Sequence, residues 1–293
     1  MNFVRSSKTC WRLILPAALL ILVAACLTAP GAQALLEQVG FLPFISHGGQ
    51  SSTATPIDQI TPVPGAVIVD HRAVTAFDDL PEETRRRASD LPILMRHASV
   101  GEEISAGLDC LAGLTPGVAG CEGFQPGVYD RSRWDFQSRG NPGWRAKVDD
   151  LVTQTALQAP EFAAFTMKFC FIDAQGEDSP DWTYYREALL QLQRDYPEKT
   201  FIWWTIPLTS SGNAGADRFN ALVRAYARAN GKVLFDIADI EAHSPQGEHQ
   251  TSAAGYEILY LAYTYDGGHL NLEGRLRVAK AWWVLAASLN GWE

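Results

Sequence analysis

The residues whose types and spacing most clearly point to chemistry are an aspartate and a histidine near the end of the chain. Asp266 lies three residues before His269, with two glycines between them. This spacing lets one short loop place the carboxylate on one imidazole nitrogen while the other nitrogen points away. The carboxylate would fix the tautomer of the ring, so the outward nitrogen could act as a general base. Such a base needs a nucleophile, and Ser99 is the best candidate, although an isolated Asp-x-x-His pair is more often solvated or structural.

Ser99 is predicted to lie between the end of a strand and the start of a helix. Residues 91–95 form a short apolar run that is consistent with a buried strand, and Ile104, Leu108 and Leu111 follow at helical spacing. Open α/β folds place their chemistry at such strand ends, where the free N–H groups of a helix N-terminus can bind an anion. The alternative is that Ser99 caps the helix, which is a common role for serine.

The rest of the chain alternates between strand-like and helix-like segments. A turn-rich segment at 135–143 contains Gly140 and Asn141. Strands are predicted at 162–172, 200–206 and 232–235, and helices at 144–155, 182–196, 216–230 and 272–289, with a short helix opening at 78–83. This alternation predicts an α/β fold with three layers, α/β/α, around a central and mostly parallel sheet. Functional loops should gather at the carboxyl ends of its strands.

Length and composition fit one large globular domain behind an N-terminal leader. The chain has 293 residues, of which 47% are hydrophobic and 19% charged, and its net charge is −9. The negative charge disfavours nucleic acid as a partner. We expect a leader at 1–34, a flexible linker rich in Gly, Ser, Thr and Pro at 35–65, and a folded domain at 66–293.

The leader carries signals for export. Three basic residues precede an apolar run at 13–27, which is short for a membrane span and typical of a signal peptide. Two cleavage sites compete: Cys26 resembles the lipidated cysteine of a bacterial lipoprotein, whereas 32–34 (Ala-Gln-Ala) would release a secreted chain. An uncleaved anchor is the third alternative. All three predict an extracytoplasmic protein, periplasmic or secreted, with a lipid anchor to a membrane if Cys26 is used.

Three cysteines lie beyond the leader. Cys110 and Cys121 flank a segment with Gly and Pro and could form a local disulfide in an oxidising compartment. Two free thiols are an equal alternative without knowledge of the geometry. Cys170 lies in an apolar run and is interpreted as a buried thiol.

Several segments, in order along the chain, resemble the SGNH (GDSL-type) serine hydrolase superfamily. The similar segments are 96–101 (Arg-His-Ala-Ser-Val-Gly), 139–142 (Arg-Gly-Asn-Pro), 167–173 (Met-Lys-Phe-Cys-Phe-Ile-Asp), 205–208 (Thr-Ile-Pro-Leu) and 266–269 (Asp-Gly-Gly-His). The resemblance runs from about Val69 to the end, and it is closest to a divergent branch with a His-x-Ser-x-Gly nucleophile block. It implies a flavodoxin-like fold and an esterase that uses no cofactor.

The resemblance also implies a role for each matching residue. Ser99 would be the nucleophile, His269 the base and Asp266 its orienter. The backbone N–H groups of Ser99 and Gly140 and the side chain of Asn141 would be the oxyanion donors.

The chain departs from the family pattern in two places. It has no Gly-Asp-Ser-Leu block, and its third block has Cys170 and Asp173 where the family has Gly-x-Asn-Asp. The second departure removes a usual oxyanion donor, whose loss can cost about 10²–10³ in rate. Asn141 could replace that donor.

Further residues are weighed as neighbours of the site. The candidates for lining the substrate are His97, Trp134, Trp144 and Asp173. For His97, a structural role under the turn is an equal alternative. A metal site made of His97, Asp266 and His269 fits no dedicated motif, so we expect no metal. His243 and His249 are predicted to be solvated, and Lys168, inside an apolar strand, needs a partner such as Asp173 or Asp236.

These observations predict an extracytoplasmic serine esterase or acyl hydrolase that uses a Ser-His-Asp triad and an acyl-enzyme, with acylated glycans as its substrates. One alternative is a catalytically silent domain of the same fold that binds a cell-envelope polysaccharide or a partner protein. Another is an O-acyltransferase that uses the same triad. The oligomeric state is not predicted.

Overall fold

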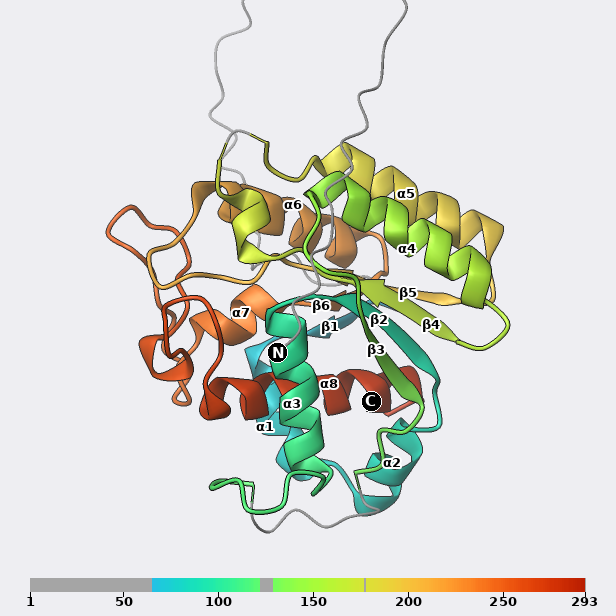
Figure 1. The fold of residues 1–293 in the computed structure, drawn as a ribbon, viewed down its shortest axis with the longest axis horizontal. Helices are drawn as coiled ribbons and strands as arrows, with labels where there is room; N and C mark the ends of the chain where they lie inside the picture. The colour runs from blue at the N-terminus through green and yellow to red at the C-terminus, as the bar shows by residue number, and fades with distance from the viewer. Residues whose placement is uncertain (1–64, 122–128, 177, 293) are drawn as a thin grey trace, which may run out of the picture. The chain divides into compact units, whose positions relative to one another are not determined.

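A six-stranded parallel sheet organises the described part of the chain, which comprises residues 65–121, 129–176 and 178–292 of the computed structural model (Figure 1). The strands are β1 (Val67–Val69), β2 (Ile93–His97), β3 (Trp134–Ser138), β4 (Ala164–Met167), β5 (Thr200–Trp204) and β6 (Val233–Phe235). Their order is β1-β6-β5-β4-β2-β3, and all neighbours pair in parallel. Apart from β1 at one edge, this is the strand order of a flavodoxin-like fold. The predicted fold class is therefore confirmed.

Helices connect these strands. They are α1 (His71–Asp79), α2 (Glu82–Ala88), α3 (Val100–Leu111), α4 (Trp144–Gln158), α5 (Trp182–Asp195), α6 (Ala214–Ala229), α7 (Ile237–Ala242) and α8 (Leu272–Leu289), with short 3₁₀ helices η2 (Phe171–Ala174) and η3 (Leu261–Tyr263). The helix predicted at 272–289 matches α8, and the Asn271 side chain caps it by accepting from the Gly274 N–H. None of the helices in the described ranges has the length and apolar character of a membrane span.

Two apolar cores cover the two faces of the sheet. In β5, Phe201 and Trp203 point to one face and Ile202 and Trp204 to the other, as the two-residue period of a strand requires. Helices α4, α5 and α6 cover the first face, and α1, α3 and α8 cover the second (Figure 1). The central strands read as continuous apolar runs because both faces are buried. The predicted three layers are present.

Three local predictions were wrong. In the strand predicted at 162–172, β4 ends at Met167, and the 3₁₀ helix η2 starts at Phe171. Residues 135–138, predicted as part of a turn, belong to β3, an edge strand whose Trp134 and Phe136 pack inward while its other side chains are polar. The turn begins at Arg139, whose N–H donates to the His97 carbonyl at 3.0 Å. The helix predicted to open at 78–83 is two helices, because α1 already starts at His71 and ends at Asp79.

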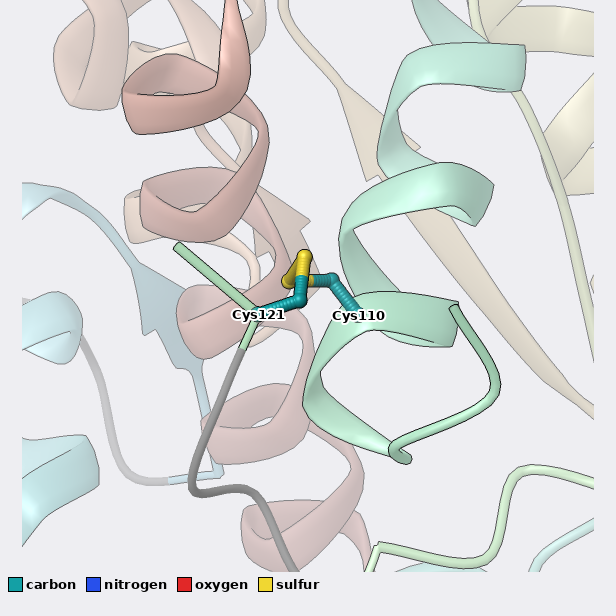
Figure 2. Close-up of a disulfide and its surroundings, with 2 residues drawn as sticks. All are labelled: Cys110 and Cys121. Atoms are coloured by element: carbon teal, nitrogen blue, oxygen red, sulfur yellow. A yellow bond between two sulfur atoms is a disulfide. The ribbon is translucent and has the colours of Figure 1, made fainter. Parts of the chain in front are cut away.

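The structure decides between the two alternatives left open for Cys110 and Cys121, and it confirms the prediction for Cys170. Cys110, in the last turn of α3, forms a disulfide with Cys121 (Figure 2). Cys170 is a buried free thiol. The predicted leader at 1–34 and nearly all of the predicted linker at 35–65, including Cys26, lie outside the described residues.

Candidate active site

Ser99 occupies a strained turn between β2 and α3. Its φ is 54° and its ψ is −117°, and it is the only non-glycine residue with positive φ within the described ranges. Such a conformation costs about 1–3 kcal/mol and persists only where the surroundings enforce it. Ser99 stands at the N-cap position of α3, but its side chain makes no capping hydrogen bond. A capping role therefore does not account for this serine.

The turn is built over the ring of His97. A Cβ added at Gly101 would lie 2.4 Å from the His97 Cβ, so only glycine lets the first turn of α3 pass this close. The exposed fraction of His97 is 1%, and neither ring nitrogen makes a hydrogen bond of normal geometry with the described residues. Burial lowers the pKa of His97, although the Phe136 backbone and Glu102 oppose this shift. His97 thus has the structural role, and its prediction as a substrate-lining residue was wrong.

The structure brings Ser99, His269 and Asp266 together. Ser99 Oγ lies 2.8 Å from His269 Nε2, and His269 Nδ1 lies 2.7 Å from Asp266 Oδ2. The other oxygen, Asp266 Oδ1, accepts from the backbone N–H groups of His269 (2.8 Å) and Gly268 (2.9 Å). The backbone N–H and the ring of His269, with the Gly268 N–H, lower the pKa of Asp266 to about 2.

The charge on Asp266 decides the tautomer of the histidine. An ionised carboxylate can only accept hydrogen bonds, so Nδ1 of His269 carries the hydrogen. In the neutral ring Nε2 is then the acceptor, and the Ser99 hydroxyl donates to it. This tautomer places a hydrogen-bond acceptor on a serine hydroxyl, which is the arrangement that general-base catalysis requires.

Two aromatic rings lie beside the imidazole, which is partly exposed. Phe171 meets it edge-on with ring centroids 5.4 Å apart, and Tyr265 lies parallel to it at 6.0 Å. The side chain of His269 is 32% exposed and that of Asp266 is 43% exposed. The histidine and its aspartate are therefore partly open to solvent, and Ser99 beside them is half-buried.

A buried acid that the sequence analysis missed ties the histidine loop to the serine helix. Glu103 of α3 is 6% exposed. Its Oε2 accepts from the Leu270 N–H at 2.7 Å, and its Oε1 lies 3.4 Å from the Tyr265 hydroxyl and 3.7 Å from Arg275. The available signal was an acid on the apolar face of the helix that follows Ser99, where a charge needs partners.

The predicted oxyanion donors lie at the same edge of the sheet as Ser99. His97 pairs with Ser138 in the β2–β3 register, so Ser99 and Gly140 are each two residues beyond that level. Asn141 Oδ1 accepts from Lys147 Nζ at 2.5 Å, which leaves the amide NH₂ as the free end of the side chain. No described residue accepts a hydrogen bond from the backbone N–H of Ser99 or Gly140 or from the Asn141 amide.

Lys147 is a second residue that the sequence analysis missed. It is fully buried on α4 and donates to Asp173 Oδ2 at 2.5 Å as well as to Asn141. Asp173 also accepts from the Cys170 N–H at 2.7 Å. Through Lys147 it therefore ties segment 167–173 to Asn141 of segment 139–142, and it does not line a substrate site. The helical period places position 147 on the same face as the buried apolar residues of α4, and that was the available signal.

Both tryptophan predictions were wrong. Trp134 is 3% exposed and pairs with Ile93 at the amino ends of the strands, which is the opposite end of the sheet from Ser99. Trp144 is 5% exposed, and its indole N–H donates to Asp178 at 2.8 Å. Proximity to Gly140 in the sequence does not tell which end of a strand a residue occupies.

The partners predicted for Lys168 were also wrong. Asp173 pairs with Lys147, as described above, and Asp236 pairs with Arg224 at 2.6 Å. Lys168 is fully buried, with its Nζ 3.8 Å from Cys170 Sγ, and burial lowers its pKa.

A cluster of histidines lies elsewhere at the carboxyl-end edge of the sheet. It includes His243 and His249, which were predicted to be solvated. His243 is only 8% exposed and stacks on His71 (centroids 3.7 Å apart, 16° between planes) and on His249 (4.7 Å, 15°). Asp239 Oδ2 lies 2.6 Å from His71 Nδ1. Burial would raise the pKa of Asp239, but the hydrogen bonds from His71 outweigh it and hold that pKa well below its ordinary value. The solvated prediction was wrong for His243, whereas the His249 side chain is 43% exposed.

Comparison with known proteins gives similarity at the level of solved structures. No family model and no curated protein matches the chain. A GDSL-like lipase from Bacteroides thetaiotaomicron has 11% identity and a TM-score of 0.46, over 75% of this chain and 97% of that one. An acetyl-xylooligosaccharide esterase from a Geobacillus species has 15% identity and a TM-score of 0.42, over 69% and 94%. An acetyl xylan esterase has 12% identity and a TM-score of 0.41, over 65% and 98%. At this level of similarity, the function of the chain has to be argued from its own side chains.

Proposed function

We propose that the protein is a serine esterase or acyl hydrolase of the SGNH type. The proposal rests on one observation, the two-bond chain from Ser99 Oγ to His269 Nε2 (2.8 Å) and from His269 Nδ1 to Asp266 Oδ2 (2.7 Å). A hydroxyl on a base, and that base on an ionised orienter, is the arrangement that makes serine a nucleophile at neutral pH.

The reaction follows from the positions of these atoms. His269 Nε2 takes the proton of Ser99 as Oγ attacks the ester carbonyl carbon. The resulting oxyanion is stabilised by the backbone N–H groups of Ser99 and Gly140 and by the amide of Asn141. His269 then gives its proton to the departing alkoxide, which leaves an acyl-enzyme on Ser99. Water, deprotonated by His269, releases the acid, and Asp266 stays ionised throughout.

The substrate we propose is an acyl group carried by a glycan outside the cytoplasm. The Cys110–Cys121 disulfide supports an oxidising compartment, and the apolar run at 13–27 has the pattern of an export signal. When the protein is produced in a bacterial host, mass spectrometry of its mature N-terminus distinguishes a lipidated Cys26 from cleavage directly after the Ala-Gln-Ala segment at 32–34. An O-acyltransferase would use the same residues, and analysis of products with and without a sugar acceptor separates the two reactions.

The test of the proposal is whether Ser99 reacts. We expect the purified protein to hydrolyse a short-chain nitrophenyl ester and to be labelled on Ser99 by a fluorophosphonate. Ser99→Ala should lose both properties with an unchanged circular dichroism spectrum. Ser132→Ala, which changes an exposed serine at the amino end of β3, should keep both. A protein that neither turns over nor takes the label would instead be the silent binding domain, for which the missing third-block asparagine is the argument.

A further inference from the structure

The stacked histidines lie where two adjacent strands end. Val69 of β1 pairs with Phe235 of β6, and α1 and α7 start directly beyond these two positions. His71 begins α1, and Asp239 lies within α7, which His243 follows as its C-cap. Carboxyl ends of parallel strands are where α/β folds build sites. Four strand spacings separate β1 from β2, so this cluster is about 19 Å from the Ser99 turn.

Three donor atoms in the cluster are close enough together for one ion to reach all of them. Asp239 lies 2.6 Å from His71 Nδ1 through Oδ2 and 3.5 Å from His243 Nδ1 through Oδ1. One ligand atom from each of the three residues lies within 4.8 Å of the others. A tetrahedral ion with bonds of about 2.0–2.2 Å holds its ligand atoms about 3.3–3.6 Å apart, so the Asp239–His71 pair has to open to admit it. The two rings are stacked nearly parallel, and they have to tilt so that the Nδ1 lone pairs of both rings point at one ion.

We propose that His71, Asp239 and His243 bind a divalent transition-metal ion of the zinc class. Two imidazole nitrogens and one carboxylate oxygen are donors that such borderline ions take, in contrast to the all-oxygen sets of calcium and magnesium. Three protein ligands leave a coordination position for solvent or for an added ligand. The distance from Ser99 makes the ion a clamp between α1 and α7, with no part in the serine chemistry.

The competing explanation is a hydrogen-bonded clamp without an ion. Asp239 Oδ2 also accepts from the His71 N–H at 2.7 Å, and His243 Nδ1 lies 2.7 Å from the Asp239 carbonyl. Arg277, which donates to the Ile240 carbonyl at 3.2 Å, adds a positive charge nearby. The two explanations differ in one measurable respect: an ion must displace the hydrogen from each ligating nitrogen, and a hydrogen bond must keep it.

The experiment is a calorimetric titration of the chelator-treated full-length protein with Zn²⁺ alone. We expect one site per chain, and thermal unfolding that shifts upward as Zn²⁺ is added. His71→Gln and His243→Gln should each weaken binding at least 100-fold. Two control variants should each bind Zn²⁺ with an affinity within about threefold of the wild type. They are His249→Gln, which lies in the same stack but outside the ligand set, and His269→Gln, whose ring lies beside Asp266.

A second measurement protects the test against variants that do not fold. In the unaltered protein, nitrogen-15 spectra of the imidazoles should show Zn²⁺ shifting the Nδ1 signals of His71 and His243 and leaving those of His269 in place. Circular dichroism in the absence of metal serves as the folding control. The proposal would be overturned, leaving the hydrogen-bonded clamp, by Zn²⁺ binding that survives both His71→Gln and His243→Gln. The same conclusion would follow if Zn²⁺ up to millimolar concentration shifted the Nδ1 signal of neither His71 nor His243.

Discussion

Two histidine–aspartate sites stand at the same edge of one sheet, and they differ in what faces the histidine. In the loop before α8, Asp266 holds one nitrogen of His269, and the other nitrogen faces the Ser99 hydroxyl at 2.8 Å. In the helical cluster, His71 Nδ1 faces the Asp239 carboxylate at 2.6 Å, whereas His243 Nδ1 lies 3.5 Å from that carboxylate and 2.7 Å from the Asp239 carbonyl. The first geometry suits the transfer of a proton, and the second suits a shared cation or a set of hydrogen bonds. Residue types alone do not separate these functions; the partner of each ring nitrogen does.

The largest expected effect comes from exchanging each aspartate for its amide. Asp266→Asn should lower kcat by about 10⁴, because the amide no longer enforces the reactive tautomer. Asp239→Asn should leave kcat within about twofold and instead lower the free energy of unfolding by roughly 1–3 kcal/mol, because it weakens the hydrogen bonds that hold His71. Ester hydrolysis and urea denaturation measure the two effects. Equal losses of kcat in both variants would abolish the distinction between the sites.

The next effect concerns the buried lysine that holds the proposed oxyanion amide. Lys147→Met leaves Asp173 unpaired in the interior, which should cost about 3–5 kcal/mol of folding stability. The matched control is Lys280→Met. Lys280 Nζ lies 3.2 Å from Asp78 Oδ1, and the Asp78 side chain is 70% exposed, so this variant should lose at most about 1 kcal/mol of folding stability. Thermal or urea unfolding compares them, and similar losses would show that the Lys147–Asp173 pair is no more than a surface contact.

A third variant tests Asn141, the donor proposed to replace the missing third-block asparagine. Asn141→Ala should lower kcat by about 10²–10³ with little change in KM, because the amide binds the oxyanion more strongly than the ground-state carbonyl. Asn230→Ala, which alters the exposed C-cap of α6, should not change kcat. If Asn141→Ala were as active as the wild type, the oxyanion would have to be held by the two backbone N–H groups alone.

The smallest effect is a pH dependence of stability that belongs to the loop aspartate. The pKa of Asp266 falls to about 2 in the folded protein, against about 3.9 in an unfolded chain. Its contribution to stability is therefore complete above about pH 4 and is lost as the pH falls toward 2. Unfolding followed at several acidic pH values should show the wild type converging on Asp266→Asn within this window. A difference that stayed constant down to pH 2 would contradict the hydrogen bonding described for this carboxylate.

Local patterns predicted the fold well, and they also predicted the approach of three candidate site residues. The apolar run of β5, the Asn271 cap and the Asp-x-x-His spacing each carry their meaning within a few neighbouring residues. These short-range signals were enough to predict the parallel sheet and to pair Ser99 with His269, which the structure brings within hydrogen-bonding distance.

The features that were missed depend on contacts between distant segments. The rings of His71 and His243 stack although the two residues are far apart in the sequence, and no local motif indicates that they meet. The sequence shows only that the buried charges of Glu103 and Lys147 need partners. It does not identify those partners, because tertiary packing decides them. For Trp134, composition could not decide which end of the sheet it occupies.

The proposed nucleophile and the proposed base both lie near the beginnings of helices that contact each other. Ser99 precedes α3, and His269 lies shortly before α8, which α3 crosses in Figure 1. A Cβ on Gly107 would lie 2.4 Å from the Arg275 carbonyl oxygen, so the two backbones are in direct contact. The reacting pair is thus as durable as this helix crossing. On heating, turnover and helical dichroism should disappear together, so the protein would be inactivated in one step at its melting temperature.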